Sequence, residues 1–309
     1  MVEYMNIVFF NHFHNGDLHI SREFIRKIID KVLSIDNSVK FSYAHSNDPC
    51  LLSDILNLNY IDLKSLRLNQ FENLNRVGDT VFINTWYAQQ KHKYMNIHGM
   101  TLDCLYEAFN DTCKSLWGFS LDDISSDPSS FIPTIDYSKF EIQKSQNWLN
   151  NNPQKKIFVS NGLALSGQAE NFLLTPIINE LAKQYPQITF ILSNKENCGT
   201  KLSSNVIYST NIIGKSGSDL NENSFITTYC DVIIGRASGV FSYAWTQQNL
   251  LQRNIKFVCF CGPGVVIRND NQFWTSHLLT NKIKYSAEFI VSHETNGNIV
   301  KNIIEKSLF

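Results

Sequence analysis

The sequence predicts an α/β protein made of two doubly wound, Rossmann-like domains that face each other across a cleft. Its 309 residues are enough for about two domains of roughly 150 residues each. Apolar segments of strand length alternate with helical segments in both halves, which is typical of parallel sheets. The alternation stops over residues 119–139, where Ser, Asp and two prolines gather. We therefore expect domains at 1–118 and 153–309, joined by a linker and connecting helix at 119–152.

The first half begins with an apolar run at residues 4–10 and continues with a helical pattern at 17–33. In that pattern apolar residues recur every three or four positions, at Leu18, Ile20, Phe24, Ile25, Ile28, Ile29 and Val32. The remaining elements expected in this half are strands at 39–44, 60–63 and 80–84 and a helix at 102–117.

The second half repeats the same rhythm after a connecting helix at 141–149. Strands are expected at 156–160, 189–193, 206–208, 231–234 and 256–261. Helices are expected between and after them, at 169–184, 221–229, 240–251 and 298–306.

Charge and composition exclude several functional classes. The 27 Lys and Arg residues nearly balance 28 Asp and Glu residues, so no bulk field attracts nucleic acid. No apolar run is long enough to span a membrane, and Asn6, Asn11 and His12 interrupt any secretory signal core. The seven cysteines form no C-x-x-C pair. These features predict a cytoplasmic protein with reduced, structural thiols.

The loop after the first strand, residues 11–17, is one candidate site. It follows the carboxyl end of a strand, where open α/β sheets bind ligands, and it carries His12 and His14. Gly16 would permit a tight turn, and Asp17 stands at the expected start of the helix. Asp17 is therefore either the N-cap of that helix or a carboxylate presented to a substrate.

The junction at residues 234–239 is a second candidate, because small residues separate a buried strand from a helix. Gly235 and Gly239 would let a diphosphate approach the backbone, and Ser238 adds a hydroxyl at the helix N-terminus. Arg236 could bind phosphate oxygens through two N–H groups. The alternative is a tight strand-to-helix turn with an exposed Arg.

The sequence predicts no metal site and no bound cofactor. His12 and His14 are two positions apart, but no Cys or carboxylate set nearby completes a standard site. No Asp-x-Asp triplet, which many metal-dependent nucleotide-sugar enzymes use, occurs in the chain.

Taken with the two-domain pattern, these two junctions resemble the GT-B class of glycosyltransferases, and within it the bacterial heptosyltransferase-like families. Those proteins begin their first helix with a Gly-Asp pair, as Gly16 and Asp17 do here, and the resemblance implies that Asp17 is the catalytic base. The segment 231–244 resembles their donor-diphosphate segment. It differs in having Arg236 and Phe241 where the family usually has an Asp and a His.

The resemblance implies an inverting, metal-independent glycosyltransferase of the kind that serves polysaccharide biosynthesis. It would move a sugar from a nucleotide-diphosphate-sugar to a glycan, a lipid-linked glycan or another hydroxyl acceptor. Asp17 would be the base, with His12 and His14 as further catalytic candidates, and the donor diphosphate would lie at Gly235, Arg236, Ser238 and Gly239. A lipid-linked acceptor would also bring the protein to a membrane surface. The alternatives are a nucleotide-sugar epimerase or hydrolase of the same fold, and a non-catalytic nucleotide- or glycan-binding protein.

Overall fold

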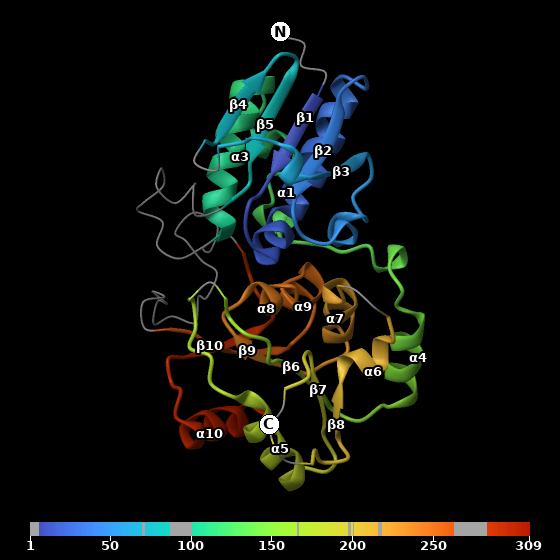
Figure 1. Cartoon of the computed structure of the whole chain (residues 1–309), viewed down its shortest axis with the longest axis vertical. Coiled ribbons are helices and arrows are strands. Elements are labelled where there is room, and N and C mark those ends of the chain that lie inside the picture. The colour runs from blue at the N-terminus through green and yellow to red at the C-terminus, as the bar shows by residue number, and fades with distance from the viewer. Residues whose placement is uncertain are drawn as a thin grey trace. The chain divides into compact units, whose positions relative to one another are not determined.

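The computed structural model describes residues 6–69, 72–86, 101–165, 167–196, 199, 201–215, 218–262 and 283–309. The chain forms two compact units, and it passes from the first to the second between Thr134 and Ile135 (Figure 1). This border lies inside the segment 119–152. Among the described residues after it, only Ile283 and Lys284 group with the first unit.

The first unit contains a five-stranded sheet of order β3-β2-β1-β5-β4. Its strands are β1 (Asn6–Phe10), β2 (Lys40–His45), β3 (Leu58–Asp62), β4 (Leu74–Val77) and β5 (Thr80–Asn84). The first three and β5 run parallel, whereas β4, which the sequence did not predict, forms an antiparallel hairpin with β5. Helices α1 (Asn15–Ile35) and α3 (Thr101–Trp117) pack against each other, and the Phe24 and Phe109 rings stack between them at 5.2 Å.

Short 3-10 helices order the segments that lack strand or helix periodicity. They are η1 (Pro49–Leu52), η2 (Leu63–Ser65), η3 (Leu121–Asp123), η4 (Pro128–Phe131) and η5 (Tyr137–Lys139). In the expected linker, an Asp or Ser side chain caps each one by accepting a backbone N–H: Ser120 for η3, Asp127 for η4 and Asp136 for η5. The polar composition that broke the helical pattern therefore builds local structure of its own.

The second unit contains a six-stranded, fully parallel sheet of order β11-β10-β9-β6-β7-β8. Its strands are β6 (Lys156–Ser160), β7 (Thr189–Leu192), β8 (Val206–Tyr208), β9 (Val232–Arg236), β10 (Lys256–Phe260) and β11 (Glu288–Ser292). Its helices are α4 (Gln143–Asn151), α5 (Leu174–Gln184), α6 (Ser209–Ile213), α7 (Leu220–Thr227), α8 (Gly239–Ser242), α9 (Gln247–Leu251) and α10 (Gly297–Ser307). One mostly parallel sheet and one fully parallel sheet, each with helices, confirm the predicted α/β class.

The second unit departs from the sequence prediction at two expected helices, and it contains helix α6 and strand β11, which the sequence did not predict. The helix expected at 169–184 begins only at Leu174, and the one expected at 240–251 is broken into α8 and α9. Between α8 and α9 the backbone turns at Tyr243 and Ala244. Apolar periodicity continues across this break because both short helices bury apolar residues, among them Phe241 and Leu250.

Both sheets have a topological switch point, where neighbouring strands are followed by connections that leave in opposite directions. In the first sheet this point lies between β1 and β5, and in the second between β6 and β9. Open α/β sheets bind ligands at the carboxyl ends of such strands. The strand order therefore selects one edge in each unit as the place to look for a site.

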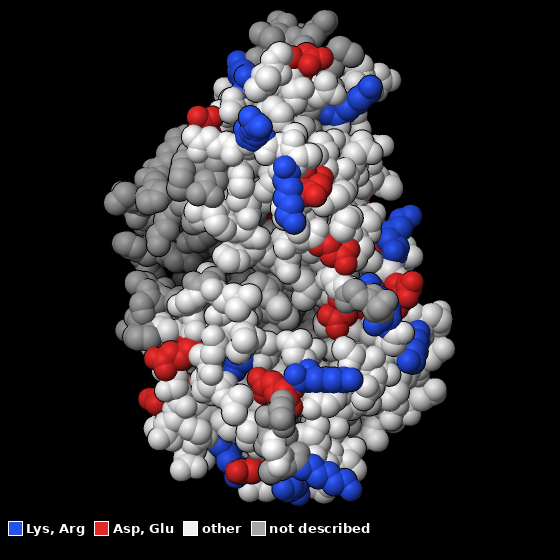
Figure 2. Space-filling model, in the orientation of Figure 1, with Lys and Arg blue, Asp and Glu red and all other residues white. Residues whose placement is uncertain are grey.

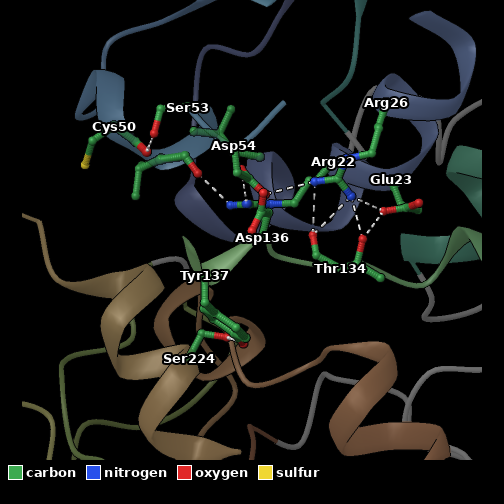
Figure 3. A network of polar contacts seen from close by, with 12 residues as sticks. Arg22, Glu23, Arg26, Cys50, Ser53, Asp54, Thr134, Asp136, Tyr137 and Ser224 are labelled. Carbon is green, nitrogen blue, oxygen red and sulfur yellow. Dashed lines mark hydrogen bonds and ion pairs between the residues drawn. The ribbon is translucent and has the colours of Figure 1, made fainter. Parts of the chain in front are cut away.

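A buried ionic network fixes α1 to the segments around it (Figure 3). Arg22 is fully buried, and its guanidinium donates to Asp54 Oδ1 and to the Leu51 carbonyl, each at 2.5 Å. Arg26, one turn further along α1, donates to the other oxygen of Asp54 at 2.8 Å. The Asp54 carboxylate thus bridges two guanidinium groups between α1 and the segment after η1, and Glu23 supplies a second negative charge by pairing with Arg26.

The chain is anchored on both sides of the border between the units (Figure 3). On the first-unit side, the Thr134 hydroxyl donates to Glu23 Oε2 at 2.6 Å, and Arg26 donates to Thr134. On the second-unit side, the Tyr137 and Ser224 hydroxyls are 3.0 Å apart. Only two residues separate these anchored positions.

The described residues contain no helix that is long and apolar enough to cross a membrane. On the face drawn in Figure 2, basic and acidic side chains are interspersed instead of gathering by sign. This distribution accords with the formal net charge of −1.

We expect Asp54→Asn to lower the free energy of unfolding by about 3 kcal/mol, because it leaves the buried Arg22 guanidinium without its counter-charge. Urea unfolding would measure the change. Glu180→Gln is the matched control: it removes an exposed ion pair with Lys301 (3.0 Å), which should be worth at most about 1 kcal/mol. Equal effects of the two substitutions would contradict the role given to the network.

Candidate functional site

The carboxyl ends of β1 and β5 form the same turn twice. Asn11, directly after β1, accepts the Phe13 backbone N–H on its side-chain oxygen at 2.8 Å. Asn84, the last residue of β5, accepts the Trp86 N–H in the same way at 2.9 Å. The Phe13 and Trp86 rings meet with their centroids 4.0 Å apart. Two adjacent strand ends thus converge on one aromatic pair.

Asp17 lies inside α1, not at its cap. The helix begins at Asn15, His14 is the N-cap without a side-chain capping bond, and Asp17 belongs to the first turn. The predicted N-cap role of Asp17 is therefore wrong, as is the tight turn at Gly16, which has helical backbone. The carboxylate stays near the N-terminus of a long helix, where a negative charge is favourable.

A buried hydroxyl network lies close to Asp17. Burial raises the pKa of the Tyr43 phenol, and the nearby Asp17 charge raises it further. The Tyr43 hydroxyl is hydrogen-bonded to Thr85 and lies 3.5 Å from the Ser21 hydroxyl. Since Tyr43 is in β2 and Thr85 follows β5, these bonds fix the strand ends beside the first turn of α1.

The two histidines of the first loop differ in environment. His12 is half-buried and packs edge-on against Phe10 at 5.5 Å, and burial lowers the pKa of its imidazole. His14 is exposed and lies against the Phe13 ring at 5.9 Å. Of these two neighbours of Asp17 in the sequence, His12 is thus a packed ring, whereas the His14 imidazole is exposed.

His45, which ends β2, was not among the residues predicted from the sequence. It is 1% exposed, packs edge-on against Tyr43 and Tyr60, and burial lowers the pKa of its imidazole from 6.5 to about 4. The charges of Asp48 and Asp62 oppose this shift without cancelling it. A polar residue at the carboxyl end of a predicted strand was the available signal, but the strand was expected to end at residue 44.

Arg236 occupies the other switch point in a way the sequence did not predict. It ends β9, is fully buried, and donates to the carbonyls of Asn161, Gly162 and Phe172. Its Nη2 also lies 3.6 Å from Glu196 Oε1. The guanidinium therefore holds the β6–α5 connection in place, and both the expected phosphate contact and the alternative of an exposed Arg are replaced by this structural role.

The side chain of Glu196 occupies the N-terminus of α5. Its Oε2 accepts the Thr175 backbone N–H at 3.3 Å and the Thr175 hydroxyl. Thr175 in turn accepts from the Asn161 amide at 3.1 Å. Because this carboxylate takes the place that an anion would take, α5 is not available for a phosphate. Only Asn161, directly after a buried strand, had a position that could have drawn attention in the sequence.

The remaining predicted donor residues lie at the start of α8. Ser238 is the N-cap, and its hydroxyl accepts the Phe241 N–H at 3.3 Å. Gly239 is the first residue of this helix, which is only four residues long. The expected dipole of a long helix is therefore absent here, although the first N–H groups of the turn still lack intrahelical partners.

Close packing leaves no room for a side chain at Gly235. A Cβ at this position would lie 2.5 Å from Phe241 Cδ2 and 2.9 Å from Ser160 Cβ. The residue therefore lets α8 and β6 close on β9, which is a different reason from the close phosphate approach expected from the sequence.

The described residues bring together no group of three or more His, Cys, Asp or Glu side chains that could hold a metal ion. In that part of the chain Cys113, Cys230, Cys259 and Cys261 are free thiols.

No protein-family model and no curated protein matches the chain. Among solved structures, the ADP-heptose lps heptosyltransferase II of E. coli aligns over 98% of this chain and 98% of its own, with 11% identity and a TM-score of 0.52. The glycosyl transferase family 9 protein of Veillonella parvula aligns over 100% and 94%, with 11% identity and a TM-score of 0.47. The iron-containing heptosyltransferase TibC, in complex with ADP-D-beta-D-heptose, aligns over 99% and 77%, with 12% identity and a TM-score of 0.49. The first likeness establishes the fold and confirms the predicted two-domain GT-B type.

We expect Gly235→Ala to lower the free energy of unfolding by about 1–3 kcal/mol, because the Phe241 ring and Ser160 must move to admit a methyl group. The measurement is urea unfolding. Gly297→Ala serves as control, since its nearest neighbour would be Ile177 Cδ1 at an ordinary 3.9 Å, and it should change stability little. An unchanged midpoint for Gly235→Ala would show that this glycine is not needed for packing.

His45 should make stability fall as the pH falls. Below its ordinary pKa of 6.5 the unfolded chain binds a proton that the folded protein, with a pKa of about 4, does not bind. Stability should therefore decrease from pH 6.5 toward 4, with a slope of at most about 1.4 kcal/mol per pH unit from this residue. His45→Phe should flatten the profile of urea midpoints between pH 7 and 5. Parallel profiles for the two proteins would refute the assignment.

Proposed function

We propose that this protein is an inverting, metal-independent glycosyltransferase that uses a nucleotide-diphosphate-sugar. The observation that carries the proposal is the position of Asp17, a half-buried carboxylate in the first turn of α1 at the switch point of the first sheet. It occurs in a chain whose fold matches that of a heptosyltransferase over nearly its whole length. The acceptor would be a hydroxyl of a glycan or lipid-linked glycan, held by the first unit.

In this mechanism the acceptor oxygen attacks the anomeric carbon of the donor while Asp17 takes the hydroxyl proton. The bond between the anomeric carbon and the diphosphate oxygen breaks, and the nucleoside diphosphate leaves with that electron pair. Attack from the face opposite the leaving group inverts the anomeric configuration. The network of Tyr43 and Thr85 keeps the strand ends fixed beside the carboxylate, so that the base is positioned before substrate arrives.

The donor diphosphate would lie at the β9–α8 junction of the second unit. With Arg236 committed to the β6–α5 connection, the groups left to meet the phosphates are the backbone of Ser238 and Gly239 and the Ser238 hydroxyl. Backbone N–H groups at such a turn stabilise negative charge without a metal ion. ADP-heptose, named for the E. coli relative in fold, is the first donor to test.

Asp17→Asn separates the catalytic role from a structural one. The substitution keeps the shape but removes the proton acceptor, so we expect turnover to fall by roughly 10²–10⁴-fold. Stability should change by at most about 1 kcal/mol, the value of a negative charge near a helix N-terminus. Turnover would be measured in EDTA as nucleoside diphosphate released from a donor, first selected by thermal shift, in the presence of a panel of glycan acceptors.

Asp30→Asn, on an exposed position of the same helix, is the matched control and should retain full activity. A folded Asp17→Asn protein with most of the wild-type turnover would remove Asp17 as the base. Loss of wild-type activity in EDTA, restored by magnesium or manganese, would remove metal independence. Hydrolysis or epimerisation of the donor without an acceptor would show that the protein is a nucleotide-sugar hydrolase or epimerase and not a transferase.

A further inference from the structure

The aromatic pair Phe13–Trp86 is built by two equivalent turns and not by a single loop. β1 and β5 are adjacent and parallel, with Phe10 in register with Asn84. An Asn-x-aromatic sequence follows β1, and another begins at the last residue of β5; in each the Asn oxygen accepts the aromatic residue's N–H. The pairing of the strands therefore brings both rings to the same edge of the sheet.

Further hydrogen bonds hold this arrangement in place. The Asn47 amide, from the loop after β2, donates to the Phe13 carbonyl at 3.3 Å. The Thr85 N–H donates to the Phe10 carbonyl at 2.9 Å, which continues the β1–β5 pairing up to the residue before Trp86. Residues that follow three strands are thus hydrogen-bonded around the pair.

The pair lies at the edge of the unit and not in its core. Phe13 and Trp86 are both half-buried, whereas Phe9 and Phe10 of the adjoining strand are fully buried. The rings are tilted by 31°, with their centroids 4.0 Å apart. Both residues keep part of their surface exposed, and the exposed imidazole of His14 lies 5.9 Å from Phe13.

This chemistry suits the ring of a sugar. One face of many pyranoses carries C–H groups with partial positive charge, and the face of an aromatic ring carries partial negative charge. Hydroxyl groups around the rim of the sugar would find the His14 imidazole as a polar neighbour. Asp17 lies one helical turn from His14, and its N–H donates to the His14 carbonyl at 3.2 Å.

We propose that Phe13 and Trp86 form a stacking platform that binds a pyranose ring of the acceptor and so selects glycan acceptors. The proposal rests on the proposed function in one respect, because it names the substrate that Asp17 would deprotonate. The binding itself needs neither a donor nor turnover.

The test is proton saturation-transfer NMR on the full chain with methyl β-D-galactopyranoside and methyl β-D-glucopyranoside, without nucleotide. We expect saturation on the ring C–H protons of one face of the glycoside. Trp86→Ala and Phe13→Ala should weaken binding about tenfold, equivalent to ~1.4 kcal/mol of lost stacking, whereas Trp86→Phe should retain most of it.

Trp117→Ala is the matched control, because Trp117 is also half-buried in the first unit and stacks on Phe119 at 5.7 Å. Thermal unfolding would establish that each variant is folded.

Three results would overturn the platform. Wild-type protein could bind neither glycoside, or a folded Trp86→Ala variant could bind as wild type does. Adenosine monophosphate could also receive Trp86-dependent saturation while the glycosides do not. If the protein binds the glycosides but transfers no sugar from any nucleotide-sugar, the platform stands and the proposed function is rejected. If it transfers a sugar but binds neither glycoside, the proposed function stands and the platform is rejected.

Discussion

A buried guanidinium group must donate its N–H groups to oxygen acceptors. Each unit of this protein contains one such group, and the segments around it supply the acceptors. Arg22 in the first unit and Arg236 in the second are both fully buried. Leaving such a charge unpaired costs several kcal/mol, so the surrounding oxygens are fixed in position. Arg22 thereby fixes α1 to the segment after β2, and Arg236 fixes the β6–α5 connection to the end of β9. These two residues thus hold segments beside the edges at which ligands would bind.

The location of Arg236 also limits how the second unit can bind an anion. The Arg236 side chain, which the sequence predicted to bind phosphate, is surrounded by carbonyls, and the N-terminus of α5 is occupied by Glu196. What remains at the β9–α8 junction is backbone and the hydroxyl of Ser238. A diphosphate bound there would be recognised by directed hydrogen bonds more than by net charge, which accords with the nearly neutral chain.

The sequence predicted the order of most strands and helices, because buried parallel strands and amphipathic helices leave clear apolar patterns. The prediction from sequence failed where contacts between distant parts of the chain determine the structure. Whether Arg236 is exposed depends on carbonyls more than 60 residues away in the chain. The break between α8 and α9 does not interrupt the apolar periodicity, and the hairpin strand β4 has too few apolar residues to stand out. Asp17 was placed near the correct helix end, but the cap lies three residues earlier.

One device recurs at both switch points: an asparagine at or directly after a strand end replaces a backbone acceptor. Asn11 and Asn84 do this in the first unit, and Asn161 does it in the second by accepting the Asn194 N–H at 2.8 Å. An amide oxygen shapes the turn without adding charge, whereas an aspartate in the same place would put a negative charge beside the substrates. If the first edge receives a neutral sugar ring and the second a diphosphate, uncharged turns serve both, since they add no negative charge to the carboxylates of Asp17 and Glu196 that already lie at these edges.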